Sequence, residues 1–202
     1  MEPDDVRQLA HDKTGDAMTP SLLLDHVKPW TESEFLAIGE TSERIELFDG
    51  SLHVTPGPTP THQHISTKLA FALTAPAEAI GLFVHEAINL RVGIDRIPIP
   101  DLAITTMIDF DEPIVDASVA RLVCEILSPS NSTTDKVLKM HYYAEAGIPW
   151  YLLVEPKTAT LRLHRLDDGK YLEYATAAPG TLLKMTEPVA VTIDPTDLLP
   201  PG

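Results

Sequence analysis

The chain has 202 residues, of which 44% are hydrophobic and 22% are charged, values that fit one soluble globular domain with a proper core. Thirty acidic residues against fifteen basic ones give a formal net charge of −15. Such a surface repels phosphate backbones, so any nucleic-acid function would need a local basic groove. No apolar run approaches the roughly 20 residues that a helix needs to cross a bilayer, which excludes a membrane-spanning helix.

The first 25 residues are polar, carry scattered charges and show no clean period. We expect residues 1–25 to form a flexible arm and residues 26–202 to form a single domain. The N-terminal sequence lacks the apolar core of a signal peptide, which favours a cytoplasmic protein. The single cysteine, Cys124, lies in an apolar segment, so we expect a small buried hydrophobe rather than a nucleophile.

Local signals predict a series of elements in the first half of the chain. Thr31 is a good cap for a short helix. The Asp49-Gly50 pair is a strong two-residue turn signal between alternating segments and predicts a hairpin. The elements expected here are a helix within residues 29–40, a hairpin over 43–56, a helix within 57–81, strands at 82–92 and 101–108, and an acidic loop at 109–119.

The second half of the chain also alternates between strands and a helix. Gly147 stands where a helix C-cap belongs, and Pro149 prevents continuation of that helix. The elements expected here are a strand at 121–127, a polar loop at 128–132, a helix at 133–146, a buried strand at 150–156, a hairpin of 160–166 and 170–176 around Asp168-Gly169, and a last strand within 189–202. This order predicts a mixed α/β (α+β) sheet in one domain.

Three carboxylates stand at strand ends or inside otherwise apolar strands: Glu46 in RIELF, Asp101 after IPIP, and Glu125 in LVCEILSP. A buried carboxylate costs free energy unless it is paired, hydrogen-bonded or bound to a metal. The loop between Asp101 and Glu125 is of a length that lets their strands lie side by side. Two or three such oxygens are what Mg²⁺ takes from a protein. Lys139, on the following helix, can position a water or neutralise charge on a phosphate.

Simpler explanations stay open for the same residues. Asp135 and Lys139 are four residues apart on a helix, a spacing that gives a surface ion pair worth about 0.2–0.5 kcal/mol. Glu125 can form a structural ion pair with Arg44 or Arg121. The aspartate after Pro-Ile-Pro can cap the start of its strand.

The histidines and serines near these segments offer weaker alternatives. His62 and His64 are two residues apart, so on a helix they face different directions, and a zinc site is the minority interpretation. Ser128 and Ser130 lack the G-x-S-x-G context of a hydrolase nucleophile, which argues against serine catalysis. We expect packing roles for three aromatic residues of the following helix: His141, Tyr142 and Tyr143.

Several short motifs follow one another in a specific order. They are PD at 100–101, CEILSPS at 124–130, D-x-x-x-K at 135–139, the tyrosine at 143, AGIP at 146–149 and YLLVEP at 151–156. In this combination the chain, from about Trp30 to Arg165, resembles the Uma-two family of the PD-(D/E)XK nuclease superfamily. The upstream segments ERIELFDGSL and PTPTHQHI are also similar to that family, and His62 matches a histidine of its pattern.

The resemblance implies a restriction-endonuclease-like fold, in which helices flank a central mixed sheet and β-hairpins are added. It implies that Asp101 and Glu125 are metal ligands, that Glu46 is a further acidic ligand, and that Lys139 is the catalytic lysine. In most of the superfamily the lysine stands two residues after the glutamate, where this chain has Leu127. In the resembled family the lysine lies on the following helix instead.

The function that this resemblance implies is a Mg²⁺- or Mn²⁺-dependent endonuclease that cleaves DNA with a metal-activated water. Such domains commonly pair to cut both strands, so we expect a homodimer. DNA binding would depend on the metal and on a few local bases: Arg91, Arg96, Lys136 and Lys139.

Two features favour another function. Trp150 and Leu152 stand where the family often shows a glutamate and a tryptophan, and the surface is strongly acidic. Both features fit a catalytically inactive descendant of the fold that acts as an interaction or regulatory module. A third possibility is a metal hydrolase acting on a small phosphorylated substrate, because such a substrate would meet less repulsion from the acidic surface.

Overall fold

The computed structural model describes residues 28–39, 41, 43–128 and 133–200, with residues 133–136 described by their backbone alone. The arm expected over residues 1–25 lies outside these residues. The largest sheet has six strands in the order β11-β10-β9-β8-β6-β3. Their bounds are β3 (Phe83–Glu86), β6 (Leu102–Thr105), β8 (Ala120–Ile126), β9 (Trp150–Glu155), β10 (Thr160–Asp167) and β11 (Lys170–Ala177).

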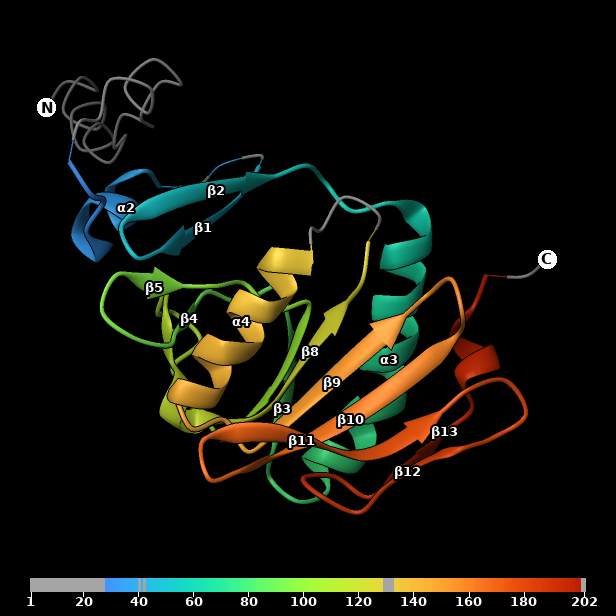
Figure 1. The fold of residues 1–202 in the computed structure, drawn as a ribbon. Helices are drawn as coiled ribbons and strands as arrows, with labels where there is room; N and C mark the ends of the chain where they lie inside the picture. The colour runs from blue at the N-terminus through green and yellow to red at the C-terminus, as the bar shows by residue number, and fades with distance from the viewer. Residues whose placement is uncertain (1–27, 40, 42, 129–132, 201–202) are drawn as a thin grey trace, which may run out of the picture.

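The pairing within this sheet is mixed. β8 and β9 are parallel and are joined by helix α4 (Thr133–Glu145), whereas every other neighbouring pair is antiparallel. β6 and β8 pair with Leu102 opposite Cys124, so the strands that carry or follow Asp101 and Glu125 lie side by side, as predicted. Figure 1 shows α4 over one face of the sheet and the long helix α3 (Pro60–Glu78) over the other.

The face of the sheet that α3 covers is apolar. Thr59 caps α3 and Pro60 is its first residue, a position where the missing N–H of proline costs nothing. Ile65, Leu69 and Leu73 then recur at helical spacing and pack against the sheet in one buried cluster. The cluster takes alternate residues of β8, including Cys124, which is fully buried as predicted.

Helix α4 ends where the sequence predicts. Gly147 has a φ of +76°, a left-handed conformation that side chains rarely adopt. The Gly147 N–H donates to the carbonyl of Ala144, and the Ile148 N–H donates to that of Tyr143. These bonds satisfy carbonyls at the helix end and turn the chain directly into β9.

A second, three-stranded sheet has the order β2-β1-β5 and stands at one end of the molecule (Figure 1). The predicted hairpin forms it, from β1 (Arg44–Phe48) and β2 (Ser51–Thr55), with β5 (Arg96–Ile97) on the other edge of β1. Asp49 and Gly50 both have positive φ, as a two-residue hairpin turn requires. Helix α2 (Glu32–Ala37) precedes the hairpin, and Thr31 caps it in a reciprocal pair with Glu34.

Besides the unpredicted strand β5, the structure differs from the predicted elements in three further places. The single strand predicted at 82–92 is divided into β3 and β4 (Leu90–Arg91), because the chain bends at Ala87, whose φ is +52°. β4 pairs in parallel with β7 (Val115–Asp116), inside the segment predicted as an acidic loop. β12 (Leu183–Met185) was not predicted, and it pairs with the last strand, β13 (Val191–Ile193).

Two short 3₁₀ helices complete the described elements: Ala117–Val119 and Pro195–Leu198. The arrangement is the mixed sheet with flanking helices and added hairpins that the sequence predicts. Among the described residues, no helix is long and apolar enough to cross a membrane.

Candidate functional site

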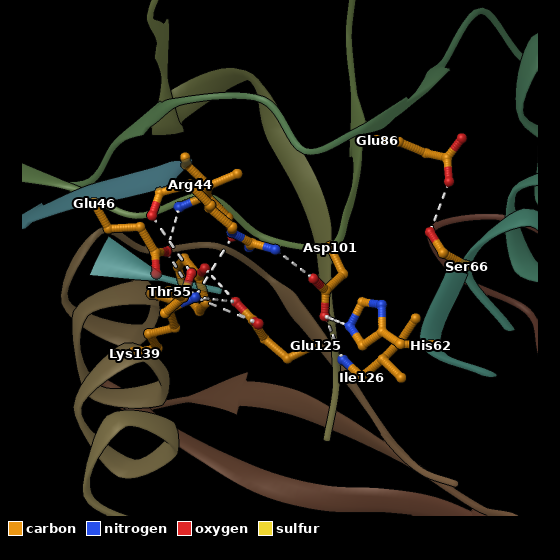
Figure 2. A network of polar contacts seen from close by, with 12 residues as sticks. Arg44, Glu46, Thr55, His62, Ser66, Glu86, Asp101, Glu125, Ile126 and Lys139 are labelled. Atoms are coloured by element: carbon orange, nitrogen blue, oxygen red, sulfur yellow. Dashed lines mark hydrogen bonds and ion pairs between the residues drawn. The ribbon is translucent and has the colours of Figure 1, made fainter. Parts of the chain in front are cut away.

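A small cavity of about 80 Å³ lies where the β1–β2 hairpin meets the start of α3, β6, β8 and α4. The ionisable side chains in its lining include Arg44, Glu46, His62, Asp101, Glu125 and Lys139. The three carboxylate residues are buried, with exposed fractions of 3% for Glu46, 5% for Asp101 and 6% for Glu125. All four of the site residues predicted from the sequence therefore lie together, with Arg44 and His62 among them (Figure 2).

Glu125 points toward α4 because strand β8 alternates. Its neighbours Cys124 and Ile126 face the apolar cluster under α3, so Glu125 faces the other side of the sheet. Lys139 Nζ lies 3.3 Å from Glu125 Oε1, and the Tyr143 hydroxyl donates to the same oxygen at 2.7 Å. Lys139 and Tyr143 are four residues apart on α4, a spacing that places both on one helix face.

Lys139 connects two of the carboxylates. Its ammonium lies 2.7 Å from Glu46 Oε1, in addition to its contact with Glu125, and 3.5 Å from the backbone oxygen of Ile99. The lysine is only 7% exposed. The interpretation of Lys139 as half of a surface ion pair is therefore wrong, and the side chain of Asp135 lies outside the described residues.

Glu46 is held by the backbone as well as by the lysine. The N–H of Ile99 donates to Glu46 Oε1 at 2.7 Å. Arg44 precedes Glu46 by two residues on β1, so both side chains lie on the same face of that strand. The hairpin register that makes this possible pairs Glu46 with His53.

Asp101 accepts hydrogen bonds on both of its oxygens. Arg44 Nη1 lies 2.8 Å from Oδ1, and His62 Nε2 lies 3.1 Å from Oδ2. The N–H of Ile126, the residue after Glu125, donates to Oδ2 at 2.7 Å, which connects the two predicted metal ligands through the backbone. His62 thus lies beside the site, in contact with Asp101.

The alternative partners proposed for Glu125 are not its direct contacts. Arg121 donates to the carbonyl oxygens of Ser118 and Ala120 at the far end of β8. Arg44 donates to Asp101 instead of to Glu125. Asp101 is therefore more than a strand cap. Its carboxylate accepts from Arg44 and from the backbone of β8, and it contacts His62.

Burial and neighbouring charges set the protonation of the cavity. Burial raises the pKa of Glu125 to about 7, since the attraction of Lys139 is partly opposed by the charge of Asp101. Burial acts in the same direction on Asp101, but the hydrogen bond from His62 and the charge of Arg44 lower its pKa to about 2. Burial lowers the pKa of Lys139, and the two glutamates outweigh that effect, so this pKa is raised.

The carboxylates fit a magnesium ion by the chemistry of their donors. Mg²⁺ usually takes one or two carboxylates and fills the rest of its octahedron with waters and substrate phosphate. Within the part of the chain that the structure describes, no three His, Cys, Asp or Glu side chains are grouped as a metal site requires. Lys139 stands between Glu46 and Glu125, so the arrangement fits a site of Asp101 and Glu125 better than one that includes Glu46.

Three residues of the site have roles that sequence reasoning missed. Tyr143 was expected only to pack, yet its hydroxyl contacts Glu125. Tyr151 lines the cavity from β9, where its buried hydroxyl has no hydrogen-bond partner among the residues that the structure describes. Arg44 was considered only as a partner of Glu125. The contacts of Arg44 and Tyr143 depend on how separate elements pack together, so no local sequence pattern indicates them.

Two of the bases expected to bind DNA, Arg91 and Arg96, form ion pairs with acidic side chains. Arg91 Nε donates to Glu32 at 2.8 Å, and Arg96 Nη1 donates to Glu145 at 2.8 Å. The side chain of Lys136 lies outside the described residues. Arg91 and Arg96 are therefore partly neutralised by carboxylates, and their role in DNA binding stays a prediction.

The two departures from the family pattern lie on the other face of the sheet. Trp150 and Leu152 belong to the apolar cluster under α3, whereas Tyr151 between them faces the cavity. Their side chains therefore pack in the core and do not line the site.

Comparison with known proteins agrees with this fold and shows the family of the chain. The sequence model of the Uma2 family, described as "Putative restriction endonuclease", matches residues 32–196. A solved structure described as "a putative nuclease belonging to DUF820 from Anabaena variabilis ATCC 29413" is similar, with a TM-score of 0.70 and 20% identity over 84% of this chain and 97% of that chain. No curated protein matches the sequence. The predicted family and fold class are confirmed.

Proposed function

This chain belongs to the Uma2 family, and we propose that it is a divalent-metal-dependent endonuclease that hydrolyses DNA phosphodiester bonds. The observation that carries this proposal is the buried cluster in which Asp101 and Glu125, on adjacent strands, share a cavity with Lys139. An ion pair with only a structural role is usually found at the surface. In a core without function, apolar side chains would be at least as stable as this buried charged cluster.

Asp101 and Glu125 would hold Mg²⁺ or Mn²⁺, with Glu46 as a further candidate ligand. When bound, the ion would supply Lewis acidity toward the phosphate and would lower the pKa of a water. Asp101 is suited to this role because its pKa of about 2 keeps it ionised at every working pH. Glu125 gives up its proton near pH 7, and a cation favours that loss.

Lys139 is placed to act on the attacking water or on the phosphate. Its raised pKa keeps the ammonium charged, and Glu46 and Glu125 fix its position. A fixed cation can orient a water and stabilise the negative charge that develops on phosphate oxygens. Tyr143 holds Glu125 from the side of α4, so that carboxylate has little freedom to turn away.

The DNA substrate and a homodimeric assembly are parts of this proposal. The net charge of −15 opposes long-range attraction of DNA, so binding has to rely on the metal and on contacts inside the site. Because the site can neutralise only a few phosphates, cleavage should be salt-sensitive but should fall only moderately as salt rises. Two copies acting together would cut both strands.

Cleavage of supercoiled plasmid in Mg²⁺ or Mn²⁺ tests the proposal. We expect nicked and linear products from the wild type, none with a chelator, and at least a hundredfold slower cleavage by Lys139→Ala. Lys157→Ala is the matched control, because that lysine is exposed and lies outside the cavity. Cleavage that continues without divalent metal, or that Lys139→Ala retains, would overturn the mechanism.

One observation favours a second candidate function, an inactive interaction module. The carboxylates are already met by Lys139, Arg44 and His62, so the cluster is largely compensated without a metal. Such a module would show no cleavage and no change of stability with Mn²⁺. A hydrolase for a small phosphorylated substrate would instead cleave that substrate and leave plasmid DNA intact.

A further inference from the structure

Arg44 lines the cavity at the start of β1, and its charge is close to the carboxylates of Glu46, Asp101 and Glu125. It is the first residue of this strand, and its side chain as a whole is 22% exposed. The charges of Asp101, Glu125 and Glu46 raise its pKa against the effect of burial. The guanidinium is thus a permanent cation on the wall of the proposed active site.

Only one nitrogen of the Arg44 guanidinium donates a hydrogen bond to a described residue. Nη1 donates to Asp101 Oδ1 at 2.8 Å (Figure 2). Nε and Nη2 are buried and have no hydrogen-bond partner among the described residues. In the planar group, Nε–H and an Nη2–H lie along one edge and point the same way. This edge is the fork that holds two oxygens of a carboxylate or phosphate.

The other fixed cation of the cavity has no comparable free edge. Lys139 carries three N–H groups and lies near three acceptor groups: Glu46, Glu125 and the backbone oxygen of Ile99. A buried donor without an acceptor costs free energy, and the cost is higher for a charged group. Of the two cations, Arg44 is the one with N–H groups, on Nε and Nη2, that lack an acceptor among the described residues and can donate to a bound anion.

We propose that Arg44 binds two oxygens of the substrate phosphate through Nε and Nη2 while Nη1 stays on Asp101. The proposal rests on the proposed function for its ligand, a phosphodiester. It assigns Arg44 to substrate binding and places the phosphate next to Asp101, because one guanidinium contacts both. A divalent ion in the cavity would offset the three carboxylate charges that otherwise repel such an anion.

The test follows the Nε–H signal of Arg44 by NMR during titration with dimethyl phosphate in Mg²⁺. This probe carries the charge of a phosphodiester, and its binding is read without any cleavage. The Arg44 signal is assigned by its loss in Arg44→Lys. We expect it to move to saturation as the probe binds, and Arg44→Lys to bind the probe about tenfold or more weakly, since lysine keeps the charge and loses the fork.

Arg91→Lys is the matched control. The Nε and Nη2 groups of Arg91 already contact Glu32, so its fork is occupied and its signal should stay in place. Thermal unfolding of Arg44→Lys checks that the variant folds. An Arg44 signal that does not move, or an unchanged affinity in folded Arg44→Lys, would overturn the proposal.

The outcomes separate this inference from the proposed function. If the Arg44 signal shifts but the protein cleaves no plasmid, phosphate binding by Arg44 is supported and the proposed nuclease activity is rejected. Plasmid cleavage with the same KM in the wild type and in Arg44→Lys, together with an unmoved signal, keeps the nuclease and removes the role of Arg44. A KM that rises more than kcat falls supports both.

Discussion

The two faces of the central sheet bury different chemistry. On the face covered by α3, Leu122, Cys124 and Ile126 of β8 are fully buried among apolar side chains. On the face covered by α4, Val123 lies in an apolar cluster, whereas Glu125, two residues further along the strand, lies in the charged cavity. One strand therefore contributes to a core on one side and to a candidate active site on the other.

This difference indicates how the fold divides its tasks. Apolar burial under α3 contributes roughly 25 cal/mol per Å² and involves no polar group that needs a partner. The cavity beside α4 holds charges whose desolvation can exceed the gain from pairing them. Stability should come from the apolar packing, whereas the charged cavity should become more stable when the charge of Glu125, whose pKa is raised by burial, is removed.

The largest expected effect is on the apolar face. Leu122→Ala should lower the free energy of unfolding by about 2–5 kcal/mol, because it removes buried methyl groups and leaves a cavity. Urea unfolding measures it through the midpoint and slope. Leu172→Ala makes the same chemical change at a residue that is 54% exposed and should stay within about 0.5 kcal/mol of the wild type. Equal losses at both positions would contradict the account.

A smaller effect of opposite sign is expected at Glu125. The pKa of this group is about 7 in the folded protein, against an ordinary value of 4.5. Between these pH values the native state binds a proton that the unfolded chain has lost, so the free energy of unfolding falls as pH rises from 4.5 to 7. Above pH 7 this loss is complete, and below pH 4.5 it is absent.

Glu125→Gln removes that pH-dependent loss. Without metal, the variant should be more stable than the wild type by about 1–3 kcal/mol at pH 8, with a smaller difference at pH 5. Urea unfolding at the two pH values measures both differences. A variant that is less stable than the wild type at pH 8 would indicate that pairing with Lys139 outweighs desolvation.

The smallest effect is expected at an exposed pair near the hairpin turn. Glu145 lies 2.8 Å from Arg96, but their side chains are 46% and 30% exposed. Glu145→Gln should therefore lower the free energy of unfolding by about 0.5 kcal/mol or less, and about 1 M salt should remove the difference. Thermal unfolding in low and high salt measures this. If Glu145→Gln lowered the free energy of unfolding as much as Leu122→Ala, the strength of an ion pair would not depend on its burial, contrary to this account.

Local patterns were sufficient for the long elements. The turn at Asp49-Gly50, the cap at Gly147 and the apolar spacing of α3 each act within a few residues, and the structure has each feature as predicted. Strands of two residues, such as β5 and β7, are too short to show any alternation. The bend at Ala87 gives no signal either, because alanine is not a residue that favours positive φ.

The sequence predicted the acidic residues and the lysine of the site, but not their partners, because those contacts depend on tertiary packing. Glu125 was evident because apolar residues surround it in the sequence, and Lys139 followed from the family resemblance. The partners Arg44 and Tyr143 depend on how β1 and α4 pack against the end of β8, which is a tertiary property. Whether Glu46 binds a metal stays a prediction, since the structure gives it a backbone N–H and a lysine as partners.

Metal binding tests the central claim most directly, because it does not depend on the choice of DNA. Thermal unfolding of the wild type, Asp101→Asn, Glu125→Gln and Glu46→Gln is measured with and without Mn²⁺. Asp167→Asn, at the exposed end of β10, is the control. A ligand that binds only the native state at 100 times its Kd stabilises by about 2.7 kcal/mol.

We expect Mn²⁺ to raise the midpoints of the wild type and the control and to leave Asp101→Asn and Glu125→Gln unchanged. The response of Glu46→Gln decides whether Glu46 is a third ligand. If Mn²⁺ leaves the wild type unchanged, or raises every midpoint equally, the cavity is not a metal site and the proposed nuclease mechanism is contradicted.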